Sequence, residues 1–149
     1  MSVINLFRGK NGFLSNFSQI QFEYDGLTYF NSESAFQAQK CANPLDRVKY
    51  TLIKNPIRAK QLGRREILPD NWAEKSYDIM YSILKAKFSN PILKEKLLST
   101  GDAYLEEENT WHDNRWGNCY CEKCKDIKGL NCLGKILMQI REEIKEENN

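Results

Sequence analysis

A carboxylate and an amine lie seven residues apart in the segment 32–40, SESAFQAQK. Seven residues are about two helical turns, so a helix over this segment presents Glu33 and Lys40 on one face, with Gln37 between them. Such a pair can work as an acid/base with a nucleophile, or as an acid/base with a phosphate anchor. The spacing alone is more typical of a solvated helix face, so the pair needs support from other features.

Cysteines form a second group of chemically capable residues. Cys121 and Cys124 have the spacing of a zinc-ligand pair, Cys119 precedes them, and Cys132 or the only histidine, His112, can complete four ligands. This pattern favours either a structural Zn²⁺ site or free thiols, and it favours a redox pair much less. The remaining cysteine, Cys41, is expected to be a small buried apolar side chain.

Positive charge is concentrated in residues 47–65. This range contains no acidic residue and seven basic ones: Arg47, Lys49, Lys54, Arg58, Lys60, Arg64 and Arg65. The whole chain has a net charge of +2, so the rest of it has a net charge of −5. This asymmetry of charge suits an anionic partner such as a phosphate or a nucleic acid. Amphipathic helices whose basic side chains face the solvent give the same pattern.

Residues 104–118 are rich in both aromatic and acidic side chains. Tyr104, Trp111 and Trp116 offer flat faces for stacking a ring, and Asp113 and residues 106–108 supply carboxylates nearby. The tryptophans serve equally well as core residues in the alternative interpretation.

The elements that position these residues are β-structure at the start and helices afterwards. We expect an extended strand over Val3–Phe7 and an extended or loop segment over 13–17. Asp25-Gly26 predicts a hairpin between two alternating runs, because both central residues must adopt positive φ. A short helix follows over 32–40, with Asn31 or Ser32 as its N-cap.

Three further helices are expected to begin at Asn-Pro pairs, Asn43-Pro44, Asn55-Pro56 and Asn90-Pro91. Apolar periodicity predicts a long helix over 71–88 and a C-terminal helix from Leu133 to Ile144, with 142–149 frayed. Residues 102–130 are expected to be mostly irregular. An irregular segment of that length in a compact chain usually has a function or is stabilised by another group.

Composition narrows the possible classes of protein. The chain has 149 residues, 41% hydrophobic and 28% charged, which predicts a single domain over 1–149 rather than a disordered or membrane protein. We expect no secretory signal. Cysteines in a chain without such a signal favour free thiols or a metal site in a reducing compartment, which predicts a cytoplasmic location. One histidine leaves little room for histidine-based catalysis, and no GxGxxG or P-loop is present.

An ordered set of motifs resembles the NADAR, or YbiA-like, family. The resemblance runs from about Leu6 to Arg141 through FLSNF (13–17), DGLTYFNSESAFQAQK (25–40), QLGRR (61–65), KAKFSN (85–90), STGDAYLEE (99–107), HDNRWG (112–117) and GLNCLGKILMQIR (129–141). It implies a mostly α-helical α+β fold, a single YbiA-like domain with a small N-terminal β-hairpin. It also implies an N-glycosidase activity. The activity expected first is the reversal of ADP-ribosylation, in which the enzyme removes ADP-ribose from guanine in nucleic acid.

The resemblance also raises the weight of the candidate site residues. The Glu and Lys of the family pattern fall on Glu33 and Lys40, and its Asp falls on Asp113, which gives the expected catalytic set. The expected substrate-binding residues are Asn16, Phe17, Arg58, Arg64, Trp72, Trp116 and Asn131. The chemistry requires no cofactor. The cysteines lie in what is expected to be a variable loop of the family, so a metal there would be an accessory of this branch that the resemblance does not support.

Three other functions compete with this hypothesis. One is N-glycosidase activity on phosphorylated ribosylamino intermediates of riboflavin biosynthesis, since the same residues serve either substrate. Another is a module that binds ADP-ribose or a related nucleotide without cleaving it. The third is a zinc-braced nucleic-acid adaptor built on the cysteines and the basic run. No membrane partner is expected.

Overall fold

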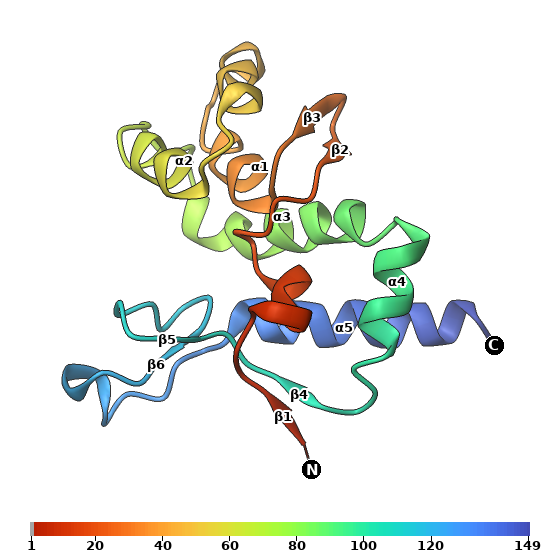
Figure 1. Cartoon of the computed structure of the whole chain (residues 1–149). Helices are drawn as coiled ribbons and strands as arrows, with labels where there is room; N and C mark the ends of the chain where they lie inside the picture. Colours follow the sequence, from red (N-terminus) through yellow and green to blue (C-terminus); the bar gives the residue numbers. More distant parts are fainter. Residues whose placement is uncertain (1) are drawn as a thin grey trace. The chain divides into compact units, whose positions relative to one another are not determined.

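The computed structural model describes residues 2–149, and this part of the chain divides into two compact units. One unit combines the N-terminal residues up to Ser15 with Pro91–Asn149, and the other is Asn16–Asn90. Helices and short two-stranded sheets make up the chain (Figure 1), which confirms the predicted α+β class. That residues 1–149 form one domain stays a prediction.

The unit Asn16–Asn90 begins with the predicted hairpin. Strand β2 (Phe22–Tyr24) pairs antiparallel with β3 (Leu27–Tyr29), and the turn residues Asp25 and Gly26 have φ of 51° and 83°. Positive φ at both positions is what a two-residue hairpin turn requires, so the Asp-Gly signal is confirmed.

Helices form the rest of this unit: α1 (Ser32–Ala38), the 3₁₀ helix η2 (Pro44–Leu52), α2 (Pro56–Gly63) and α3 (Trp72–Lys87). Helix α1 packs against η2, α2 and α3 (Figure 1). The side chains of Asn43 and Asn55 each accept a hydrogen bond from the amide two residues on, as the Asn-Pro signal predicts. The helix after Asn43 is 3₁₀ rather than α-helical, in keeping with the low helix propensity of Val48, Tyr50 and Thr51.

The other unit contains two short parallel pairs of strands. Strand β1 (Val3–Ile4) pairs with β4 (Tyr104–Leu105), and β5 (Glu108–Asn109) pairs with β6 (Asn118–Cys119). Its helices are the 3₁₀ helices η1 (Gly9–Leu14) and η3 (Glu122–Cys124), α4 (Pro91–Leu98) and α5 (Cys132–Glu147).

Two expectations for this unit differ from the structure. The first strand ends at Ile4 rather than Phe7, and residues 13–14 complete η1 instead of lying extended. Helix α5 continues to Glu147, and fraying of residues 142–149 stays a prediction. The segment 102–130 is mostly irregular, as predicted, and its regular elements are the short strands β4, β5 and β6 and the 3₁₀ helix η3.

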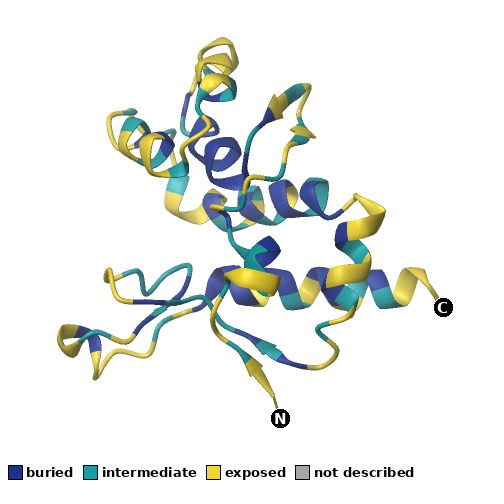
Figure 2. Cartoon of the chain, viewed as in Figure 1, coloured by how far each residue is buried: buried dark blue, intermediate teal, exposed yellow. Residues whose placement is uncertain are grey.

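Buried apolar side chains hold each unit together (Figure 2). The predicted stripe of α5, including Leu133, Ile136, Leu137 and Ile140, is buried, and α5 packs against α4 and β4. Gly134 permits this contact, because a Cβ there would collide with the carbonyl oxygen of Leu105. Among the described residues, no helix combines the length and apolar character needed to cross a membrane.

Candidate active site

Helix α1 is a short helix whose polar side chains are buried. Ser32, Glu33, Ser34 and Gln37 are each at most 7% exposed, and the capping residue Asn31 is fully buried. Polar groups are seldom buried unless they are hydrogen-bonded, and burying a carboxylate is costly. A structure that buries so many of them on two turns is a candidate for a functional site.

Hydrogen bonds fix the start of α1 and its glutamate. The side chain of Asn31 accepts from the amide of Ser34 at 2.8 Å and donates to the carbonyl of Lys54 at 3.0 Å. The amide of Glu33 donates to the carbonyl of Asn16 at 3.0 Å, and the Ser32 hydroxyl donates to Oδ1 of Asn16 at 2.8 Å. Asn16, a predicted substrate-binding residue, is therefore engaged in positioning the helix end that carries Glu33.

Gln37 orients the Glu33 carboxylate. Nε2 of Gln37 donates to Oε1 of Glu33 at 3.0 Å, while its own Oε1 is buried with no hydrogen-bond partner among the described residues. The amide lies against Gly63, the last residue of α2, where a Cβ would collide with the Oε1 of Gln37 and lie 2.7 Å from its Cδ. The absence of a side chain at Gly63 thus makes room for the residue that holds Glu33.

Lys40 follows α1 and is half-buried. Burial lowers the pKa of its amine below the usual value; the nearby Glu33 carboxylate opposes this shift, and Arg64 and Lys60 add to it. The electrostatic coupling between Lys40 and Glu33 supports the predicted placement of the two groups near each other. A lowered pKa increases the neutral fraction of the amine, which is the form that attacks carbonyl carbon.

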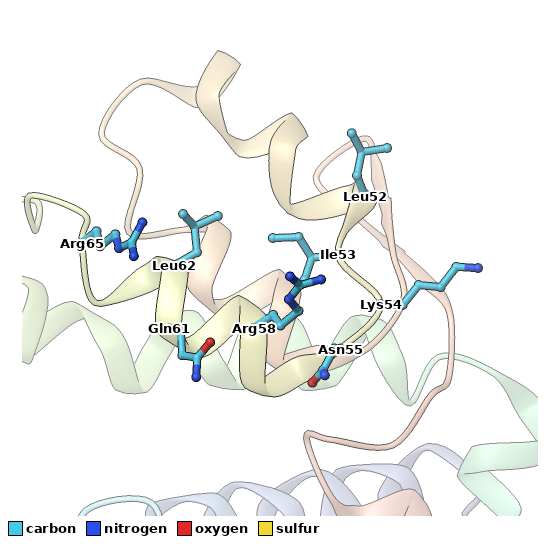
Figure 3. A pocket seen from close by; sticks show the side chains of 8 residues that line it. All are labelled: Leu52, Ile53, Lys54, Asn55, Arg58, Gln61, Leu62 and Arg65. Atoms are coloured by element: carbon cyan, nitrogen blue, oxygen red, sulfur yellow. The ribbon is translucent and has the colours of Figure 1, made fainter.

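The four basic residues at the end of the basic run, from Arg58 to Arg65, fall into two groups on different sides of α2. Arg58 and Arg65 line a cavity of about 580 Å³ (Figure 3), together with Leu52, Ile53, Lys54, Asn55, Gln61 and Leu62. Lys60 and Arg64 instead act on Lys40. The two predicted phosphate-binding residues, Arg58 and Arg64, are therefore on different sides of the helix.

Two predicted aromatic binding residues also belong to this unit. Trp72 packs against Phe36 of α1, with ring centroids 5.3 Å apart, so it supports the helix that carries Glu33. Phe17 is exposed and follows Asn16 in the chain. Substrate binding by either residue stays a prediction.

Asp113, Trp116 and Asn131 belong to the other unit. Oδ1 of Asp113 accepts from the amides of Arg115 at 3.1 Å and Trp116 at 2.9 Å, and the Arg115 guanidinium lies 5.2 Å from the Trp116 ring centroid. These contacts order the loop itself. The catalytic role of Asp113 and the stacking role of Trp116 stay predictions.

Asn131 joins separate parts of the backbone. It is buried with φ of 51°, accepts from the amide of Glu107 at 3.0 Å and donates to the carbonyl of Leu105 at 2.8 Å. These bonds give it a structural role, and its assignment to substrate binding stays a prediction.

Four possible metal ligands converge in this unit. One ligand atom from each of His112, Cys119, Cys121 and Cys124 lies within 4.8 Å of the others, while Cys132, the first residue of α5, is outside the group. Of the two residues considered for the fourth position, the structure favours His112. Cys41 is buried as expected, and burial raises the pKa of its thiol to about 11.

Sequence reasoning assigned no role to two residues of interest. Gln37 holds Glu33, and the only sequence signal for this contact is its spacing of four residues from that glutamate. Lys87, near the end of α3, is fully buried, and burial lowers its pKa to about 7. Nothing in the local sequence distinguishes it from the exposed lysines.

Comparison with known proteins places this geometry in context. The NADAR domain family model matches residues 6–145. N-glycosidase YbiA of Escherichia coli (strain K12) is 33% identical over 148 residues, which cover 96% of this chain and 89% of that protein. The NMR structure of E. coli YbiA covers 99% of this chain and 87% of its own, with a TM-score of 0.84 and 33% identity.

A plant protein matches over part of its length. The chloroplastic riboflavin biosynthesis protein PYRR of Zea mays is 36% identical over 151 residues, covering 89% of this chain but 23% of the maize protein. The present chain therefore corresponds to one segment of that larger protein.

Proposed function

This chain belongs to the NADAR domain family, and from that membership we propose that it removes ADP-ribose from ADP-ribosylated guanine in nucleic acid. Its similarity to N-glycosidase YbiA supports, more coarsely, a hydrolase that acts on N-glycosyl bonds. The observation that carries the assignment to particular residues is the buried Glu33 carboxylate, oriented by Gln37 and electrostatically coupled to Lys40.

The proposed reaction breaks the bond between C1 of ribose and the guanine amino nitrogen. Positive charge develops on the sugar as the C–N bond lengthens, and a buried carboxylate stabilises it strongly because the local dielectric constant is low. Water adds to C1 and loses a proton, and the departing nitrogen gains one. Glu33 carries out one or both proton transfers in this proposal.

Lys40 has two roles compatible with its position. As a neutral amine it attacks C1 of the ring-opened ribose, and the guanine amino group then leaves with a proton as the Schiff base between Lys40 and C1 forms. Water hydrolyses this Schiff base, which releases ADP-ribose and the free lysine. As an ammonium it anchors a phosphate together with Lys60 and Arg64, whose charges act at the same place.

The basic run supports a substrate with several phosphates. Arg58 and Arg65 line the cavity of Figure 3 on one side of α2, and Lys60 and Arg64 lie on another. Two separate groups of positive charge suit a pyrophosphate and a nucleic-acid backbone better than a single small anion. The proposed partner is therefore ADP-ribosylated nucleic acid.

A second substrate class is favoured by a specific observation. The Zea mays relative is named a riboflavin biosynthesis protein, and phosphorylated ribosylamino intermediates of that synthesis contain the same kind of ribose C1–N bond. The named residues serve this substrate equally, so the two classes must be compared directly.

Turnover on both substrates tests the proposal. The purified chain is incubated with ADP-ribosylated guanosine DNA and, separately, with a phosphorylated ribosylamino pyrimidine, and released products are measured by chromatography. We expect release of ADP-ribose by the wild type and at least a ~100-fold loss in Glu33→Gln. Glu23→Gln is the control, because it makes the same chemical change at an exposed strand residue.

Each outcome has a defined meaning. Faster turnover of the ribosylamino substrate would move the function to riboflavin chemistry, and binding without turnover would favour the binding module. Equal activity of Glu33→Gln and wild type would remove Glu33 from the mechanism.

Borohydride reduction during turnover separates the two roles of Lys40. A trapped adduct that is lost in Lys40→Ala and kept in Lys75→Ala, an exposed control on α3, supports the Schiff base. An adduct that persists in Lys40→Ala but disappears in Lys87→Met would identify Lys87 as the nucleophile. Absence of any adduct leaves Lys40 with the charge-only role.

A further inference from the structure

The four potential metal ligands in residues 112–124 have no part in the hydrolysis proposed above. We propose that His112, Cys119, Cys121 and Cys124 bind one Zn²⁺ ion in a closed structural site. Three thiolates and one imidazole are a ligand set that zinc favours in such sites. The proposal is independent of the glycosidase reaction.

The spacing of the ligand atoms fits zinc. Nδ1 of His112 lies 3.3 Å from Sγ of Cys121 and 3.5 Å from Sγ of Cys124, and all four ligand atoms lie within 4.8 Å of one another. In a tetrahedral site, zinc bond lengths of about 2.3 Å to sulfur and about 2.0–2.1 Å to nitrogen separate sulfur from nitrogen by about 3.6 Å and sulfurs by about 3.8 Å. Only small movements of these side chains are needed.

Backbone geometry around the ligands supports the same conclusion. The amide of Cys124 donates to the carbonyl of Cys121 at 3.0 Å, which forms the tight turn that brings a C-x-x-C pair to one point. The amides of His112 and Cys121 point at Sγ of Cys119, at 3.3 and 3.5 Å. Such amide donors stabilise the negative charge of a coordinating thiolate.

The surrounding segment has almost no apolar core. Within residues 106–130, all of which the structure describes, the large apolar side chains of Trp111, Tyr120, Ile127 and Leu130 are more than half exposed. The residues buried there are Asn109, Gly117, Cys119 and Cys124. A segment that buries cysteines while exposing most of its aromatic and aliphatic side chains needs a stabiliser other than hydrophobic burial, and a bound metal provides one.

Four protein ligands leave no open position for water or substrate, so the metal is structural rather than catalytic. Binding converts up to three thiols to thiolates and releases their protons. Asp113 and Trp116 lie between two of the ligands in the chain, so zinc restricts the loop that carries them.

Elemental analysis of the full chain, purified in reducing buffer without chelator, is the first test. We expect one zinc per chain, loss of zinc in Cys124→Ser, and full retention in Cys132→Ser, a buried cysteine outside the cluster. Less than about a tenth of an equivalent of zinc, with all thiols titratable and no uptake of added Zn²⁺, would overturn the proposal. Stoichiometric iron, or loss of zinc in Cys132→Ser, would overturn it equally.

Cobalt substitution and proteolysis keep the test decisive if Cys124→Ser fails to fold. The Co²⁺ form should show tetrahedral d–d bands and thiolate charge transfer, and His112→Cys should shift them toward a four-sulfur spectrum. Chelation of zinc from the wild type should speed tryptic cleavage at Lys123, Lys125 and Lys128 about tenfold or more, as the loop opens locally. Unchanged cleavage or absent charge-transfer bands would contradict the proposed site.

Discussion

Gly63→Ala tests whether the contact between α2 and Gln37 positions Glu33. The new Cβ would collide with Oε1 of Gln37 and lie 2.7 Å from its Cδ and 3.3 Å from its Cβ, so the amide must move. Overpacking of this kind costs about 1–3 kcal/mol, and alanine recovers up to about 1 kcal/mol through helix propensity. We expect a net loss of about 1–2 kcal/mol in the free energy of unfolding, which lowers Tm by about 2–8 °C.

The same substitution should lower activity through the carboxylate. A displaced Gln37 no longer donates to Oε1 of Glu33, and small misplacements of reacting groups cost up to about 100-fold in rate. We expect kcat to fall by about 10- to 100-fold. The assays are urea unfolding followed by circular dichroism, and product release on whichever N-glycoside the wild type cleaves.

Two comparisons isolate the cause. Gly12→Ala is the matched control, because its Cβ meets nothing within 4 Å. Adding Gln37→Ala to Gly63→Ala removes the clashes with Oε1 and Cδ and leaves only the 3.3 Å approach of the two Cβ atoms. The double variant should therefore be about as stable as Gln37→Ala alone, giving a coupling energy of about 1–2 kcal/mol. Stability within about 0.5 kcal/mol of wild type, together with unchanged kcat in Gly63→Ala, would refute the reasoning.

Two further predictions concern buried polar groups. Because the pKa of Lys87 is about 7 in the folded chain and returns to the ordinary 10.5 on unfolding, the free energy of unfolding should rise between pH 7 and 10.5 by up to about 5 kcal/mol, and urea unfolding of Lys87→Met should lack this rise. A slope that is the same in both proteins would contradict the buried, neutral lysine. Asn31→Ala removes a cap and leaves the carbonyl of Lys54 without this donor, so it should cost about 2–3 kcal/mol in thermal unfolding. Asn43→Ala removes an exposed cap and should cost at most about 1 kcal/mol in stability. Equal losses of stability in the two variants would contradict the greater importance of the buried cap.

Local signals predicted much of the fold. The Asp25-Gly26 turn and the helix start at Asn55-Pro56 depend on the backbone preferences of a few residues. The local sequence was therefore enough to predict both features. The parallel pairing of β5 with β6 was not predictable, because two-residue strands carry no periodicity and a connection as short as the one between them is more typical of antiparallel pairs.

The candidate site was predictable in residue type but not in detail. Helical spacing and family resemblance drew attention to Glu33 and Lys40, although α1 ends at Ala38, before Lys40. The burial of α1 depends on packing against α2 and α3, which the sequence does not show. The choice of His112 over Cys132 likewise required three-dimensional distances, since both fit the sequence pattern.

The hydrogen bonds that close the base of the loop 118–129 have a consequence for evolution and engineering. The amide of Gly129 donates to Oδ1 of Asn118 at 2.8 Å, and the amide of Asn131 donates to the carbonyl of Gly117 at 3.1 Å. These bonds join the two ends of the loop through residues that lie outside the turn at 121–124. The tip of the loop, residues 121–126, can therefore change in length or composition while the ends stay attached. We expect this tip to accept inserted peptides, and a metal-binding turn could be gained or lost there during divergence without refolding α5.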